Sequence, residues 1–362
     1  MKKTAFFIFS LLTLVGLTTA CDEGTDPKPP TPPSKTITDI SFDQSTVNLE
    51  VGDNEELDYN ITPSNGNKTT IVWSSSNERV AEVDDDGYVT AIGYGKAVIT
   101  AETSSVISTV TIKVAEPKRT YKLVWSDEFN GSSVDRNKWT YDVGGNGWGN
   151  KQKEYDTDGL NTRIENGFLV IEARKETFKF NDYTSTRMNT KNNASFRYGK
   201  WEARISVPSG RGTWPAFWLM PTKSEYGGWP MSGEIDIMEH VGSDPRMISH
   251  AVHTGQYSGG NAWDYQIRQD NVENNYHIYA IEWIDNYQNG NDAILFYVDG
   301  KLSTIKDQGN YATSKSSDWP FDKNFYVILN LAIGGTWGGT IDDSIFPVQM
   351  KVDYVRIYQL VK

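Results

Sequence analysis

The 362-residue sequence predicts an all-β protein made of two β-sandwich domains. Short runs of apolar residues alternate with polar ones along most of the chain, which is the pattern of half-buried strands. Turn-forming Gly, Asn and Asp residues separate these runs, and runs with helical periodicity are scarce. The length exceeds that of one typical domain, so we expect two.

The composition indicates which kinds of molecule this protein can bind. Hydrophobic residues make up 38% and charged residues 23% of the chain, as in globular proteins. The formal net charge of −12 argues against a nucleic-acid partner, which would require a basic surface. With 12 Trp, 19 Tyr and 14 Phe, aromatic residues exceed what the core needs, and we expect some on a binding surface. An uncharged substrate fits best.

Residues 1–20 have the layout of a targeting segment. Lys2 and Lys3 precede an apolar stretch, 5–17, that is too short for a comfortable membrane span. The segment resembles a bacterial lipoprotein signal that ends before Cys21, the single cysteine of the chain. The resemblance implies a lipid-anchored protein of the bacterial cell envelope, on the outer-membrane surface; ordinary secretion is the alternative.

Residues 21–35 are an acidic, proline-rich tether. Residues 36–116 predict a small β-sandwich, and the motifs at 73–77 and 87–101 resemble bacterial immunoglobulin-like domains of group 2, which implies a spacer or adhesive module. The expected strands are 37–42, 47–51, 71–73, 80–83, 88–92, 97–101 and 106–114.

Residues 120–362 predict a larger antiparallel sandwich rich in Trp, Tyr, Gly and Asn. If its sheet is curved, the concave face is long enough for a polymer. The expected strands are 169–173, 199–207, 216–220, 248–253, 276–283, 293–298, 325–331 and 350–358, together with the segment 234–239.

The segment 234–239 (Glu-Ile-Asp-Ile-Met-Glu) carries the candidate chemistry. Side chains alternate along a strand, so Glu234 and Asp236 share a face and Glu239 would point the other way. One extra residue in a β-bulge, for which Met238 is the candidate, would return Glu239 to that face. Converging carboxylates raise one another's pKa, which suits a reaction that needs one protonated and one ionised acid.

Paired carboxylates beside exposed aromatic residues are typical of glycoside hydrolysis. The short spacing on one strand favours the close separation of a retaining enzyme. A solvated strand face or a calcium or magnesium site could also account for the three acids. Neither alternative accounts for the Trp-rich segments at 213–218 and 229–230.

The second domain resembles glycoside hydrolase family 16, and its laminarinase-like β-1,3(4)-glucanases in particular. The resemblance implies a β-jelly-roll with a cleft across its concave sheet, with Glu234 as nucleophile, Asp236 as helper and Glu239 as general acid/base. It also implies that His253 lies near the acid/base. The matching motifs are 125–129, 147–150, 167–173, 198–204, 214–219, 234–239, 280–283, 319–322, 330–335 and 352–356.

Several residues are candidates for substrate contacts. Trp rings can stack on sugars, and the resemblance places Arg187 near the negative subsites. Trp214 and Trp218 are not both expected to face the cleft. Relatives carry Glu and then Gln where this chain has Gln152 and Glu154, which leaves the linkage preference open. The candidates are Trp148, Asn150, Arg187, Trp214, Trp218, Trp229 and Trp337.

The resemblance implies no cofactor for catalysis but a structural calcium on the convex side. Its ligands would be Asp353 and backbone carbonyls near Glu128 and Gly167. The expected function is endo-acting, retaining hydrolysis of β-1,3- or mixed-linkage β-1,3-1,4-glucans by a monomer that meets the membrane only through its lipid anchor. The alternatives are a surface glycan-binding lipoprotein without turnover and a hydrolase of another polysaccharide, such as a galactan.

Overall fold

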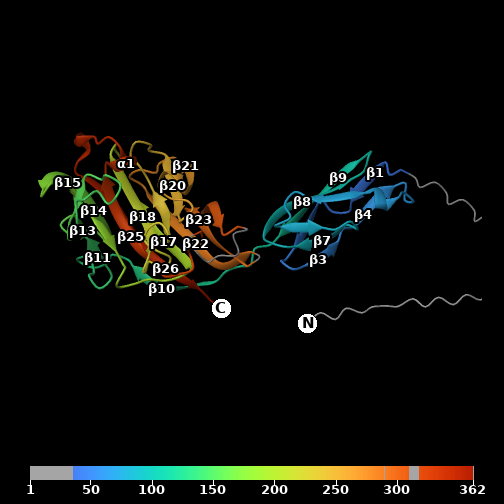
Figure 1. Cartoon of the computed structure of the whole chain (residues 1–362), viewed down its shortest axis with the longest axis horizontal. Coiled ribbons are helices and arrows are strands. Elements are labelled where there is room, and N and C mark those ends of the chain that lie inside the picture. Colours follow the sequence, from blue (N-terminus) through green and yellow to red (C-terminus); the bar gives the residue numbers. More distant parts are fainter. Residues whose placement is uncertain (1–35, 289, 310–317, 362) are drawn as a thin grey trace, which may run out of the picture.

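The computed structural model describes residues 36–288, 290–309 and 318–361 (Figure 1). The predicted signal segment, the tether and Cys21 lie outside the described residues. Within the described part of the chain, none of the helices has the length and apolar character needed to span a membrane.

The N-terminal domain is an immunoglobulin-like sandwich. A four-stranded sheet, β2-β9-β8-β5, and a three-stranded sheet, β3-β7-β6, enclose a core around Leu57, Ile99 and Ile112, and β1 pairs with β4. Strand β3 was not expected, because its three residues are polar and exposed. The elements are β1 (Asp39–Phe42), β2 (Thr46–Leu49), β3 (Asn54–Glu56), β4 (Tyr59–Thr62), η1 (Lys68–Thr70), β5 (Val72–Ser75), β6 (Ala81–Val83), β7 (Tyr88–Ala91), β8 (Gly95–Glu102) and β9 (Ile107–Val114).

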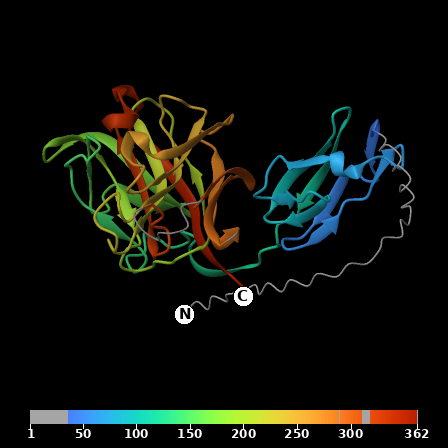
Figure 2. The same ribbon diagram turned by 45° about the vertical axis from the view of Figure 1, so that its right-hand side comes forward.

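The C-terminal domain contains the remaining strands in two large sheets (Figures 1 and 2). The elements are β10 (Tyr121–Asp127), β11 (Thr140–Asp142), β12 (Glu154–Asp156), β13 (Thr162–Glu165), β14 (Phe168–Phe178), β15 (Asn181–Ser185), β16 (Arg187–Asn189), β17 (Gly199–Ser206), β18 (Thr213–Pro221), β19 (Glu234–Glu239), β20 (Met247–His253), η2 (Gly259–Asn261), β21 (Trp263–Arg268), β22 (Tyr276–Gln288), β23 (Asn291–Val298), β24 (Lys301–Asp307), β25 (Phe325–Ile333), α1 (Gly335–Gly338), η3 (Asp343–Ile345) and β26 (Val348–Leu360).

One of these sheets has seven strands in the order β11-β16-β25-β18-β19-β20-β21, and the other has ten. One face of the seven-stranded sheet packs on the ten-stranded sheet through a single large core that includes Phe217, Ile237 and Leu329. Residues that alternate with these, such as Trp218 and Asp236, lie on the opposite face. The predicted all-β class is confirmed, and the open face of the seven-stranded sheet positions the site.

The two domains contact each other beside the β22–β23 hairpin. The Tyr94 and Tyr287 rings pack edge to face with centroids 5.7 Å apart. Gln288 donates a hydrogen bond from Nε2 to the Tyr94 carbonyl oxygen at 3.0 Å. Tyr94 thus joins the small apolar cluster formed by Ile284, Tyr287 and Leu295.

Candidate active site

Strand β19 contains a β-bulge between Asp236 and Glu239. Asp236 pairs with Ala251 and Glu239 with Ser249, so Ile237 and Met238 together oppose one residue, His250. Both bulge side chains are fully buried in the core. Because they share that face, Glu239 returns to the face of Glu234 and Asp236. The bulge was predicted with Met238 as its extra residue; on the β18 side Met238 pairs with Phe217, and Ile237 is the residue without a partner.

A buried histidine satisfies the backbone group that the bulge releases. His250 Nδ1 lies 2.7 Å from the Ile237 carbonyl oxygen, and burial lowers the pKa of His250 to about 4. The ring is therefore neutral at ordinary pH, and its Nδ1–H donates to the carbonyl. His250 therefore supports the bulge and does not face the open side of the sheet.

Two tryptophans hold the two glutamates from different elements. Trp229, in the loop before β19, donates from Nε1 to Glu234 Oε2 at 2.7 Å. Trp214, on β18, donates from Nε1 to Glu239 Oε1 at 2.9 Å. Asp236 lies between the glutamates and is only 2% exposed. Each glutamate is therefore oriented by its own indole, a role that the sequence had not revealed.

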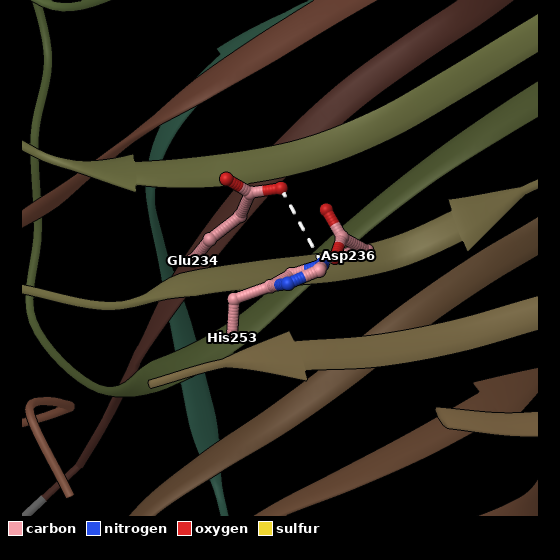
Figure 3. Close-up of side chains that lie close together, drawn as sticks. All are labelled: Glu234, Asp236 and His253. Carbon is pink, nitrogen blue, oxygen red and sulfur yellow. Dashed lines mark ion pairs between the residues drawn. The ribbon is translucent and has the colours of Figure 1, made fainter. Parts of the chain in front are cut away.

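His253 lies beside Glu234 and Asp236 (Figure 3), and it also lowers the pKa of Glu239, the expected acid/base. Its Nε2 is 3.2 Å from Asp236 Oδ2 and 3.8 Å from Glu234 Oε1, and neither contact is aligned as a hydrogen bond. The Gly259 backbone N–H donates to His253 Nδ1 at 3.1 Å. The proton of the neutral ring is therefore on Nε2, toward the carboxylates.

The electrostatics separate the two glutamates. Burial, followed by the charge of Asp236, raises the pKa of Glu234 to about 8, whereas His253, the Trp229 N–H and Arg187 lower it. Burial and Asp236 also raise the pKa of Glu239 well above its usual value, with the Trp214 N–H and His253 opposing them. Burial raises the pKa of Asp236 to about 7. Glu234 has more groups that favour its ionised form, so Glu239 is the better reservoir for the shared proton.

The same acids also resemble a cation site. Glu234, Asp236 and His253 each offer one ligand atom, and these atoms lie within 4.8 Å of one another. Each glutamate accepts an indole N–H, and this donor occupies a carboxylate oxygen that a metal ion would use. The indole N–H groups therefore favour acid–base chemistry over cation binding.

Beyond the carboxylates, the Trp218 ring, the Arg187 guanidinium and the Trp148 ring stack in a row that extends across the sheet toward β16. We call these three residues the aromatic row. The Arg187 guanidinium carbon lies 4.7 Å from the ring centre of Trp148 and 4.6 Å from that of Trp218. Arg187 Nε donates to Asp142 Oδ2 at 3.0 Å. Trp214 and Trp218 both lie on the open face, because positions four apart on a strand share a face, but Trp214 is buried in an apolar cluster with Val241 and Met247. Trp214 is 9% exposed, close to a core residue.

The last two substrate candidates lie at another part of this face. Trp337, in the one-turn helix α1, packs edge to face on Trp214 with ring centres 5.6 Å apart. Asn150 is exposed, and its carbonyl oxygen accepts the Thr336 N–H at 2.8 Å. Asn150 thus connects the Trp148 loop to the helix that carries Trp337.

Sequence reasoning missed three polar residues that anchor the aromatic row. Asp142 holds Arg187, Asp156 accepts the Trp148 N–H at 2.7 Å, and Asn330 accepts the Trp218 N–H at 2.7 Å. They come from β11, β12 and β25, which lie far apart in the sequence. Alternation within the expected strand 325–331 could have put Asn330 on the open face, but β11 and β12 are too short to show a pattern.

The pairing of β26 with β10 and β14 places the proposed calcium ligands near one another, but Asp353 already accepts a hydrogen bond from Arg204. Leu169 pairs with Val352 and Asp127 with Val355, which places Gly167 and Glu128 near Asp353. Asp353 Oδ2 accepts a hydrogen bond from Arg204 at 2.7 Å, which leaves one carboxylate oxygen for a cation. The backbone carbonyls supply the hard oxygen donors that calcium prefers. The residues fit a calcium ion that shares Asp353 with Arg204.

Comparison with known proteins agrees with this geometry. The sequence profile of glycosyl hydrolases family 16 matches residues 148–356, and that of the bacterial Ig-like domain (group 2) matches residues 36–114. A beta-glucanase of Rhodothermus marinus is 44% identical over 254 residues, covering 67% of this chain and 86% of the relative.

Solved structures give the same picture. The laminarinase structure from Rhodothermus marinus superposes with a TM-score of 0.63 at 42% identity, covering 67% of this chain and 99% of the other. The laminarinase from Flavobacterium sp. UMI-01 gives 0.59 at 40% identity, covering 66% and 100%. With a family profile over more than half of its length and relatives of this similarity, the chain belongs to glycosyl hydrolases family 16.

Proposed function

We infer that this protein is an endo-acting hydrolase of β-1,3- and mixed-linkage β-1,3-1,4-glucans. The bulge in β19 is the observation that carries the inference, because it turns Glu239 to the face of Glu234. The similarity to a beta-glucanase and to laminarinases supports the substrate class. The aromatic residues on the open face suit the apolar faces of glucose rings.

The reaction follows a retaining double displacement. Glu234 attacks the anomeric carbon while Glu239 donates its proton to the leaving glycosidic oxygen, so that a covalent glycosyl-enzyme forms and the first product leaves. Glu239, now ionised, takes a proton from water, and the resulting hydroxide displaces Glu234 from the sugar. Both carboxyl groups end in their starting protonation states.

Asp236 and His253 tune the nucleophile rather than react. The Asp236 charge raises the pKa of Glu234, and a positive charge on His253 lowers it. His253 is tied to the Gly259 amide, so Nε2 stays directed at both acids. The pair can therefore stabilise Glu234 as it changes from a free carboxylate to an ester and back.

The direct test measures new reducing ends from laminarin, barley-type mixed-linkage glucan and agar, with the wild type and Glu234→Gln. We expect the wild type to cleave the two glucans and the variant to lose at least about 10³-fold in kcat. A wild type that binds laminarin without cleaving it would support the glycan-binding alternative. Cleavage of agar alone would support a galactan hydrolase.

We also propose that Cys21 is lipidated and holds the enzyme, as a monomer, at the outer surface of the bacterial envelope. The basic and apolar segments before Cys21 and the proline-rich tether after it support this location. Metabolic labelling with a palmitate analogue should mark the wild type and not Cys21→Ser. An unlabelled wild type would favour ordinary secretion.

A structural calcium at Asp353 is proposed on the fit described above. Its role would be to join the end of β10 and the start of β14 to the middle of β26, so removal should lower stability and leave the acid–base chemistry intact. We expect a chelator to lower the Tm of the wild type and not that of Asp353→Ala. A chelator that leaves the wild-type Tm unchanged would exclude the site.

A further inference from the structure

The outer end of the aromatic row depends on one buried carboxylate. Asp156 on β12 is 2% exposed, and its Oδ2 accepts the Trp148 indole N–H at 2.7 Å. None of the ion pairs formed by the described residues includes Asp156. Burial raises the pKa of Asp156 to about 7, and the Trp148 N–H opposes that rise. Burying a carboxylate without an ion pair is costly, which calls for a compensating role.

Trp148 needs such an anchor. It lies between Gly147 and Gly149, and all three residues adopt left-handed backbone conformations, Trp148 with φ 48°. A bulky residue rarely adopts this conformation unless its surroundings impose it. The Asn146 side chain accepts the Trp148 backbone N–H at 3.1 Å, and Asp156 fixes the indole.

The anchored indole completes a layered arrangement. Arg187 lies against both Trp148 and Trp218, and its positive charge lowers the pKa of Glu234. The row begins at Trp218 on β18, beside the catalytic strand, and strands β25 and β18 separate β19 from β16, so the backbone of Arg187 lies about 14 Å from that of β19 at the usual strand spacing. A glucan must therefore extend beyond the sugar bound at the acids before it meets the outer end of the row.

We propose that Asp156 is a positioning residue for a remote glucan subsite, in which it holds Trp148 against Arg187 so that the outer sugars of a long chain find a preformed stack. The proposal rests on the proposed function, because it takes a glucan as the ligand. Preorganisation of this kind acts on affinity, since the rotamer entropy of the indole is lost before binding.

The test measures the Kd of a short and a long laminari-oligosaccharide by calorimetry, in the full chain carrying Glu234→Gln. A hydrogen bond to a charged group contributes about 1.5 kcal/mol, so Asp156→Ala should weaken the long ligand about tenfold and the short one less than about twofold. Asp156→Asn keeps an acceptor and should restore most of the affinity. Asp158→Ala, an exposed neighbour paired with Arg136, is the control and should change neither value.

A double-mutant cycle distinguishes positioning from general damage to the fold. Trp148→Ala should match Asp156→Ala, and the double variant should be no weaker than either, because both changes remove one stack. Additive losses, or equal losses for both ligands, would overturn the proposal. If the wild type cleaves no glucan but these Kd differences remain, the proposed catalysis is wrong and the subsite stands; no glucan binding by the Glu234→Gln parent would overturn both.

Discussion

At the scale of single residues, the site works by giving two chemically identical side chains different surroundings. The Trp229 N–H, His253 and Arg187 lower the pKa of Glu234, whereas the Trp214 N–H and His253 lower that of Glu239. This asymmetry supports the proposed roles of Glu234 as nucleophile and Glu239 as acid/base.

Removing each indole donor should move one limb of the pH profile. Trp229→Phe raises the pKa of Glu234, so more alkaline solution is needed to ionise the nucleophile, and the acidic limb of kcat/KM moves up by about one pH unit. Trp214→Phe raises the pKa of Glu239, which then keeps its proton longer, and the basic limb moves up by a similar amount. Each variant is the control for the other. If Trp229→Phe moved the basic limb and Trp214→Phe the acidic limb, the roles of the two glutamates would be exchanged.

A second buried acid tests the electrostatics away from the catalytic pair. Burial raises the pKa of Glu154 well above 4.5, and its Oε2 accepts the Ile333 N–H at 2.8 Å. Above the ordinary Glu pKa, the native state binds more protons than the unfolded chain, so the free energy of unfolding falls as pH rises. Glu154→Gln removes this titration.

The expected result is a variant more stable than the wild type at about pH 8, with a gain that shrinks toward the ordinary Glu pKa. Thermal unfolding at several pH values measures it, with the exposed Glu165→Gln as control. A Tm difference that is constant with pH would show that Glu154 is not protonated in the native state.

At the scale of elements, the β19 bulge was predictable and the aromatic row was only partly so. Three acids at 234, 236 and 239 on an apolar strand require an extra residue if they are to act together, so the bulge followed from alternation. The anchors Asp142 and Asp156 lie on three-residue strands whose burial comes from tertiary packing. The contact of His253 with Asp236 depends on the pairing register of β19 and β20, which no local pattern specifies.

Shortening the bulge should abolish activity by turning Glu239 into the core. Deleting Met238 restores simple alternation, and loss of the acid/base is expected to reduce kcat by about 10²–10⁴-fold. Met238→Leu keeps the residue count and nearly the volume, so stability should fall by less than about 1.5 kcal/mol with activity retained. Initial rates on laminarin and urea unfolding measure both effects; equal losses of activity would show that the bulge is not required.

At the scale of the whole molecule, the immunoglobulin-like domain contacts the catalytic domain beside the β22–β23 hairpin. Tyr94 packs there against Tyr287 and accepts a hydrogen bond from Gln288. Strands β22 and β23 belong to the ten-stranded sheet, whereas the site is on the seven-stranded one. The open face of the latter therefore does not need the N-terminal domain.

Deleting residues 36–116 should leave kcat on soluble laminarin within about twofold of the full chain, since no site residue is lost. Tyr287→Ser in the shortened chain limits any effect of the newly exposed ring. A large fall in kcat with unchanged Tm would assign the domain a part in catalysis rather than a spacer role.

The central claim is that Glu234 and Glu239 act as a retaining pair on β-1,3-glucan. Proton NMR spectra recorded from the first minutes of laminari-oligosaccharide hydrolysis report the configuration of each new reducing end. The account predicts that the β-anomer appears first and that the α-anomer follows only through mutarotation. Initial appearance of the α-anomer would contradict it.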